Sequence, residues 1–91
     1  MAMPVYVDNG RNQYGRMKMA HMLADSLDEL HAMADRVGLK RKWFQNHGIP
    51  HYDLCQAKRL LAVQAGAIGI GRREVVALIR VWRVKQASKI T

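Results

Sequence analysis

From residue 17 onwards, short apolar segments alternate with longer amphipathic ones, and this alternation limits the folds open to the chain more than any other feature. Residues 17–24 favour a strand buried on both faces, because Ser26 and Glu29 form a capping box that starts a new helix just after them. Repeated strand–helix units are typical of parallel strands joined by right-handed crossovers. We therefore expect a single α/β domain over residues 1–91, with a small, mainly parallel sheet of three or four strands and about three packed helices.

Turn and capping signals set the expected boundaries. We expect strands at residues 5–7, 17–24, 42–45 and 67–70 and helices at residues 26–37, 53–65 and from 72 onwards. Gly38 and Gly66 follow the first two helices, where a left-handed residue commonly ends a helix. Asp8-Asn9-Gly10 predicts a turn after the first strand. The link to the second strand is too short for a parallel crossover, so the first strand is either its antiparallel neighbour or lies elsewhere in the sheet.

The net charge of +8 is unevenly distributed. Residues 40–91 contain eleven basic residues and two acidic ones, Asp53 and Glu74. This asymmetry suits a polyanionic partner, either a nucleic acid or a phosphorylated ligand, and equally a solvated basic surface. Cys55 is the only cysteine, which fits a reducing, cytoplasmic compartment. No apolar run approaches the roughly 18 residues of a membrane span, and residues 1–6 do not resemble a secretory signal, so we expect no membrane association.

The stretch of residues 45–59 concentrates groups that move protons or hold phosphate. We expect His47, His51, Tyr52 and Asp53 in a loop that leads into the second helix, whose free N–H groups would attract an anion. His51 would act as general acid or base near neutral pH, and Asp53 would orient it. The alternative is that Asp53 only caps the helix and the histidines are merely exposed.

Basic residues supply the expected anion site. Arg72 and Arg73 follow the turn at residues 69–71, and parallel strands would place them on the same sheet edge as His51. Lys58 shares a helix face with apolar residues, so it either packs its stem with the charge at the rim or reaches over the sheet edge to an anion. The sequence therefore predicts a phosphate site at this edge.

Histidines elsewhere in the chain have two interpretations. We expect His31 to point toward the sheet as a further catalytic candidate, with Asp25 lining the same pocket. The alternative for both His31 and His21 is a hydrogen-bonded core residue, which is what a histidine on an apolar face more often is. The spacing of the four histidines with the aspartates matches no ligand signature, so we expect no metal and no cofactor.

Other features leave two further functions open. Residues 40–44 (KRKWF) interleave basic and aromatic side chains, and arginines recur along the last helix, a pattern suited to gripping a nucleic-acid backbone. The aromatic residues fit the core equally well. A third function is an accessory role in which the basic surface binds an acidic host protein. Val76, Val81 and Val84 favour self-association as a homodimer, unless the sheet covers them.

Several segments together resemble a known family. They are PVYVD (4–8), GRM (15–17), HMLAD (21–25), ELHAMAD (29–35), WFQ (43–45), HYD (51–53) and AKRLLAVQAGA (57–67). The chain resembles the bacterial and phage proteins grouped as domain of unknown function 4031. The resemblance implies a small cytosolic domain and carries no activity with it. From the residues themselves, we expect binding of a phosphate-bearing ligand, a nucleotide or a nucleic-acid end, with hydrolase or transferase activity.

Overall fold

The computed structural model describes residues 4–46 and 49–90, which form one mixed sheet and three α-helices. Five strands lie in the order β4-β5-β3-β1-β6, and the short strand β2 pairs with β3 off this path. The strands are β1 (Val5–Asp8), β2 (Asn12–Tyr14), β3 (Met17–Ala24), β4 (Phe44–Gln45), β5 (His51–Cys55) and β6 (Ile68–Ile70). The helices are α1 (Leu27–Arg36), α2 (Gln56–Gln64) and α3 (Arg72–Ile90), with a 3₁₀ turn at Arg41–Trp43.

The α/β class is confirmed, but the expectation of a mainly parallel sheet of three or four strands is wrong. Strand β3 is antiparallel to β1, β2 and β5, and β4 is antiparallel to β5. Among the strands that the structure describes, only β1 and β6 pair in parallel. The reason is that residues 44–55 form two paired strands where one strand and a loop were expected, so the chain reverses its direction before α2.

Strand β5 was missed because its polar residues resemble a loop. Its burial alternates, with Tyr52 and Leu54 almost fully buried and His51, Asp53 and Cys55 less so. This period of two is typical of a strand with one face in the core. Asp53 therefore lies within β5 and does not cap α2, which begins at Gln56.

Local signals placed the first helix correctly. Strand β3 covers residues 17–24, and the hydroxyl of Ser26 accepts a hydrogen bond from the Glu29 amide at 3.3 Å. Gly38 follows α1 with φ of 81°, as its position predicted. The capping box and the glycine act within a few residues of chain, so their effect does not depend on the sheet.

The first strand is the antiparallel neighbour of β3, which settles the alternative left open by the short link. Val7 pairs with Met22 and Asn12 pairs with Met19, so the four residues 8–11 face only residues 20 and 21. The predicted turn at residues 8–10 is thus a bulge in a continuing hairpin. The chain reverses later, next to Gly15, whose φ of 59° lies in the left-handed region.

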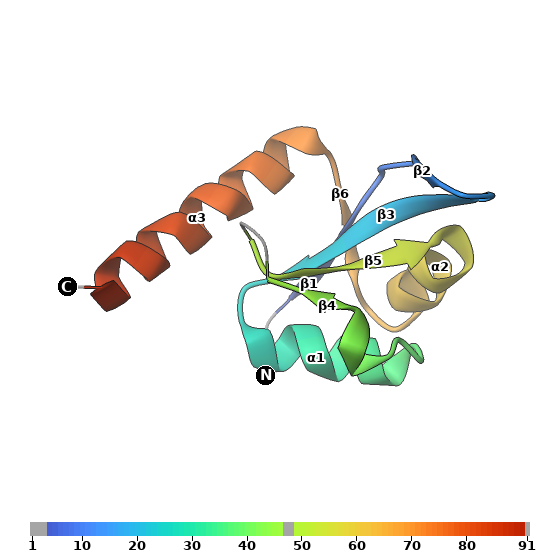
Figure 1. The fold of residues 1–91 in the computed structure, drawn as a ribbon, viewed down its shortest axis with the longest axis horizontal. Helices are drawn as coiled ribbons and strands as arrows, with labels where there is room; N and C mark the ends of the chain where they lie inside the picture. The colour runs from blue at the N-terminus through green and yellow to red at the C-terminus, as the bar shows by residue number, and fades with distance from the viewer. Residues whose placement is uncertain (1–3, 47–48, 91) are drawn as a thin grey trace.

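The sheet separates two different surfaces. Its core face packs against α1 and α2, and the buried residues there include Val7, Met22, Leu54, Leu30 and Ala62. Helix α3 lies on the opposite side of the sheet from α1 (Figure 1). The Trp82 indole fixes it by donating a hydrogen bond to the Ala24 carbonyl at 2.9 Å. No helix in the described part of the chain combines the length and apolar character needed to cross a bilayer.

Candidate functional site

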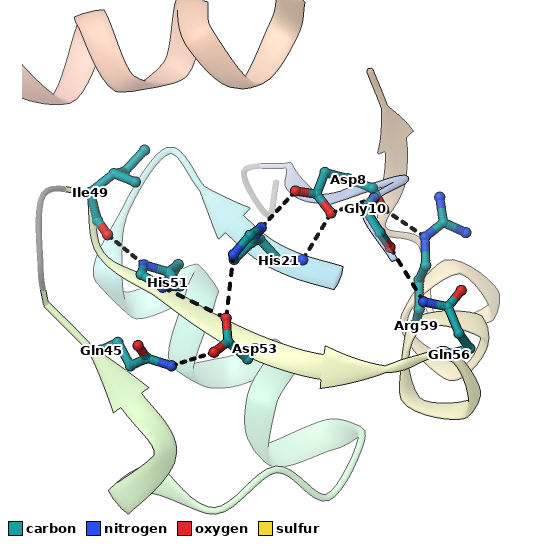
Figure 2. A network of polar contacts seen from close by, with 9 residues as sticks. All are labelled: Asp8, Gly10, His21, Gln45, Ile49, His51, Asp53, Gln56 and Arg59. Carbon is teal, nitrogen blue, oxygen red and sulfur yellow. Dashed lines mark hydrogen bonds and ion pairs between the residues drawn. The ribbon is translucent and has the colours of Figure 1, made fainter. Parts of the chain in front are cut away.

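Three acidic and imidazole side chains lie in a row across the middle of the sheet, on the face away from α1 and α2. His21 pairs with Asp53 across β3 and β5, and Asp8 lies on the other side of His21 in β1 (Figure 2). Each is the outward residue of a strand whose neighbours, Val7, Met22 and Tyr52, point into the core. The alternation of three paired strands therefore brings these groups together.

Asp8 is the most buried member of the row, with 8% of the residue exposed. Its Oδ1 accepts hydrogen bonds from the Gly10 amide at 3.0 Å and the His21 amide at 2.9 Å. Its Oδ2 lies 2.8 Å from Nδ1 of His21. Burial raises the pKa of Asp8, but the imidazole and the two amides outweigh it, so the pKa lies below its usual value. The bulge at residues 8–11 supplies one of these amides, since it turns Gly10 back toward the carboxylate.

His21 is held in one orientation by this carboxylate. Its Nδ1–H donates to Asp8, and its Nε2 faces Oδ1 of Asp53 at 3.5 Å. The hydrogen bond with Asp8 raises the pKa of His21, burial lowers it, and the charges of Asp8 and Asp53 raise it again, so the net shift is upward. His21 is thus a positioned imidazole and not the core residue that the sequence suggested.

His51 reaches the same place from the start of β5. Its Nδ1 lies 2.8 Å from the Ile49 carbonyl, which can only accept, so Nδ1 carries the proton. Its Nε2 lies 3.7 Å from Oδ1 of Asp53. The His21 and His51 rings stand edge to face with centroids 5.3 Å apart. Two Nε2 atoms therefore converge on one carboxylate oxygen.

Asp53 is itself fixed from the other side. The Gln45 side-chain amide donates to its Oδ2 at 2.7 Å, which leaves Oδ1 toward the two imidazoles. We call His21, His51 and Asp53 the histidine–aspartate cluster, with Asp8 and Gln45 as its supporting residues.

A cleft of about 530 Å³ borders the cluster at Asp53 and Gln45. Strand β4 pairs only with residues 51 and 52 of β5, so the edge of β5 from Asp53 to Cys55 is left open along the cleft. The remaining lining is mostly apolar with two lysines, and consists of Met17, Met19, Leu39, Lys42, Trp43, Leu54, Cys55 and Lys58. The cleft thus joins an apolar surface to the cluster.

The structure brings together some of the predicted site residues and separates others. His51 and Asp53 are adjacent, as expected, although they stand in a strand and not in a loop before a helix. Cys55 holds the N-cap position of α2 without a side-chain hydrogen bond, so the predicted anion site at this helix start is not formed by Asp53. His47 lies outside the described residues.

His31 and Tyr52 lie on the core face of the sheet, away from the cluster. Nδ1 of His31 is 2.7 Å from the hydroxyl of Tyr52, which is fully buried, and the His31 ring packs edge to face on Phe44. Burial lowers the pKa of His31, and the nearby charge of Arg41 lowers it further. His31 therefore does not lie beside His51, and the imidazole that does is that of His21.

Arg72 and Arg73 do not share an edge with His51. Strands β5 and β6 run in the same direction, but β3 and β1 lie between them. His51 begins β5, whereas both arginines follow the end of β6 and are exposed. The predicted common edge assumed neighbouring parallel strands, and the antiparallel pairing removes it.

Lys58 and Asp25 have structural partners. The Lys58 ammonium donates to the Val37 carbonyl at 2.8 Å and so caps the end of α1, while its side chain also lines the cleft. Asp25 accepts a hydrogen bond from the Tyr6 hydroxyl at 3.1 Å. Asp25 follows β3, at the end where α3 is anchored, and is not part of the cluster.

Sequence reasoning missed His21, Asp8 and Gln45 as site residues. One signal for His21 was available, since alternation along residues 17–24 places it opposite the buried Ala20 and Met22. The same alternation in HYDLC places His51 and Asp53 on one face. No local signal identifies Asp8 as the partner of His21, because the bulge sets their pairing.

Together, the fold and the cluster define a small α/β domain with a histidine–aspartate site on the outward face of a mixed sheet. Residues 5–82 match the sequence model of the family described as Protein of unknown function (DUF4031), and the chain belongs to this family. Neither the curated proteins nor the solved structures yielded a match.

Proposed function

We propose that this protein binds a phosphate-bearing ligand, a nucleotide or a nucleic-acid end, in the cleft along β5 and hydrolyses its phosphate ester. The observation that carries the proposal is the convergence of two imidazole Nε2 atoms on Asp53, at the border of a cleft that also contains two lysines. Reactive groups at the border of a mostly apolar cleft are the usual arrangement of a small-molecule site.

The lining of the cleft offers one surface for the base of a nucleotide and another for its phosphate. Met17, Met19 and the exposed Trp43 offer an apolar and aromatic surface on which a base can stack. Lys42 and Lys58 supply positive charge for phosphate, and Lys58 keeps two further N–H donors beyond the one given to Val37. The net charge of +8 increases the encounter rate with any polyanion.

The cluster supplies the chemistry for hydrolysis. A water molecule held by the two Nε2 atoms and Oδ1 of Asp53 would be oriented there, and one Nε2 atom would accept its proton. Its oxygen would form the new bond to phosphorus as the ester P–O bond breaks, and the leaving oxygen would take a proton from solvent. The supporting contacts from Asp8, Ile49 and Gln45 keep these groups in place before the ligand binds.

Binding and turnover are tested separately. Thermal shift and calorimetry with mononucleotides and 5′-phosphorylated oligonucleotides should show binding that Lys42→Ala weakens. Hydrolysis of bis-p-nitrophenyl phosphate and of the nucleotides bound should be lost in Asp53→Asn, while nucleotide binding persists. Arg72→Ala is the matched control, because this cation lies away from the cleft. If no nucleotide binds, or if Asp53→Asn turns over as fast as wild type, the proposal is wrong.

A second candidate function is non-enzymatic binding of nucleic acid through α3. Arg72, Arg73, Arg80 and Arg83 are all exposed on this helix, which gives it a row of phosphate contacts. Gel-shift titrations at two salt concentrations should then show affinity that falls steeply with salt. Arg80→Ala should weaken this binding and Asp53→Asn should not, the reverse of the pattern expected for the cleft.

A further inference from the structure

We infer that His21, His51 and Asp53 form a binding site for a divalent transition-metal ion, with zinc as the favoured ion. The role of such an ion in hydrolysis rests on the proposed function, whereas its binding rests on the cluster alone. The sequence led us to expect no metal because the ligands come from two strands and share no spacing signature. The pairing of β3 with β5 brings His21 next to Asp53, although the two residues are far apart in the sequence.

The distances fit a metal centre. One ligand atom from each of His21, His51 and Asp53 can be chosen so that all lie within 4.8 Å of one another. Oδ1 of Asp53 is 3.5 Å from Nε2 of His21 and 3.7 Å from Nε2 of His51. A tetrahedral ion with bonds of about 2.0–2.1 Å holds its ligand atoms roughly 3.4 Å apart. Small side-chain rotations therefore close the site around an ion.

Each of the three ligands has a supporting contact that directs it toward the others (Figure 2). Asp8 accepts from Nδ1–H of His21, and the Ile49 carbonyl accepts from Nδ1–H of His51, so both rings present Nε2. Gln45 occupies Oδ2 of Asp53 and leaves Oδ1 for an ion. A carboxylate or carbonyl behind each imidazole is the arrangement that orients histidine ligands in metal proteins.

The set of donor atoms selects the class of ion. Imidazole nitrogens suit zinc and its first-row neighbours, while magnesium and calcium prefer oxygen ligands throughout. Two histidines and one carboxylate leave at least one position for water, as in catalytic zinc sites. The charges also balance, since Asp8 and Asp53 together offset a divalent cation held by neutral imidazoles.

A bound ion would replace the imidazole base proposed above, because both Nε2 atoms would then hold the ion and could not accept a proton from water. Asp53 and Gln45 line the cleft, so an ion held by Asp53 would lie at the border of the cleft. Water bound to such an ion would ionise near neutral pH and would supply the nucleophile for hydrolysis.

Direct titration tests the site without any substrate. Untagged protein stripped with a chelator should bind one equivalent of Zn²⁺ in calorimetry. His51→Gln and Asp53→Asn should abolish this binding, and Asp8→Asn and Gln45→Ala should weaken it by roughly 10–100-fold. His31→Gln is the matched control: it removes a histidine from the core face and should leave the affinity unchanged. Absent binding in the wild type, or equal affinity in Asp53→Asn, would overturn the inference.

Spectroscopy on the wild type keeps the test independent of how the variants fold. Nuclear magnetic resonance should show Zn²⁺ shifting the ring signals of His21 and His51 and not those of His31. Cobalt substitution should give visible absorption typical of a site with few ligands. Ring shifts confined to other histidines would show that the ion binds elsewhere and would contradict the site. Metal binding without phosphatase activity would reject the proposed hydrolysis and leave the metal site standing.

Discussion

Asp8 contacts His21 through both of its carboxylate oxygens: Oδ1 accepts the His21 backbone amide at 2.9 Å, and Oδ2 lies 2.8 Å from Nδ1 of the ring. One residue thus fixes both the pairing of β1 with β3 and the direction of an imidazole. This double contact links the stability of the hairpin to the geometry of the cluster.

Replacing Asp8 with Asn should destabilise the protein by about 1–3 kcal/mol, because the amide group turns a donor toward Nδ1–H or loses the backbone contacts. Urea denaturation followed by circular dichroism measures the change. Asp35→Asn is the control, since this carboxylate forms only an exposed ion pair with Arg41 at 3.5 Å. An Asp8 variant as stable as wild type would show that the double contact contributes little to stability.

Replacing Tyr52 with Phe should remove the hydrogen bond to His31 at a cost of about 0.5–1.5 kcal/mol. The metal affinity and the cleft should be unaffected, because the Tyr52 hydroxyl lies on the core face. Chemical denaturation and Zn²⁺ titration of the same variant check both statements. A loss of metal affinity in this variant would mean that the two faces of the sheet are coupled.

Protonation of His31 should lower the stability in mild acid, whereas His21, whose pKa is raised, should act in the opposite direction. Burial and the charge of Arg41 lower the pKa of His31 below the usual 6.5, while Asp35 and Asp28 oppose the shift and Tyr52 is its hydrogen-bond partner. The folded state therefore binds the proton less readily than the unfolded state. The stabilisation is fully present above pH 6.5 and is lost as the pH falls toward the lowered pKa of the folded protein.

The His31→Gln variant isolates this contribution. From neutral pH to about pH 5, the free energy of unfolding of wild type should fall relative to that of this variant, because only wild type loses the contribution of His31. Urea midpoints at several pH values provide the measurement. Parallel pH curves for the two proteins would assign the acid sensitivity to other groups.

Replacing Trp82 with Ala should release α3 from the sheet. Trp82 is 8% exposed and donates to the Ala24 carbonyl, so truncation removes both packing and a buried hydrogen bond, typically a loss of about 3–5 kcal/mol. Hydrogen exchange should accelerate along α3 while β3 and β5 stay protected. The exposed neighbour Val81 offers the control, since Val81→Ala should change neither the stability nor the hydrogen exchange of α3. Unchanged exchange in α3 would mean that other contacts hold this helix.

Signals between near neighbours in the sequence predicted several secondary-structure elements. Ser26 and Glu29 began α1 where predicted, and Gly38 and Gly66 both adopt positive φ after their helices. The segment at residues 17–24 is a strand as expected, but it is buried on both faces only at its end, since residues 17–19 are exposed or half-buried. His51 and Asp53 were identified as candidate site residues because they are close in sequence, and the structure places their side chains 3.7 Å apart.

The sequence did not predict the direction of the strands or the residues that contact His51 and Asp53. Whether β5 runs with or against β3 depends on pairing between segments some thirty residues apart, and the antiparallel arrangement moved Arg72 away from His51. His21 and Asp8 entered the site through pairing register and through a two-residue bulge, features that no spacing rule encodes.

The amino-acid sequence by itself determined the α/β class, the starts of α1 and α3, the ends of α1 and α2, and the family to which the chain belongs. The helix boundaries could be predicted because they depend on backbone conformations and side-chain contacts between near neighbours in the sequence. Only the tertiary structure decided the order and direction of the strands and gathered Asp8, His21, His51 and Asp53 into one cluster. The physical reason is that sheet pairing joins distant segments, and a shift of one residue in register would turn each of these side chains to the other face.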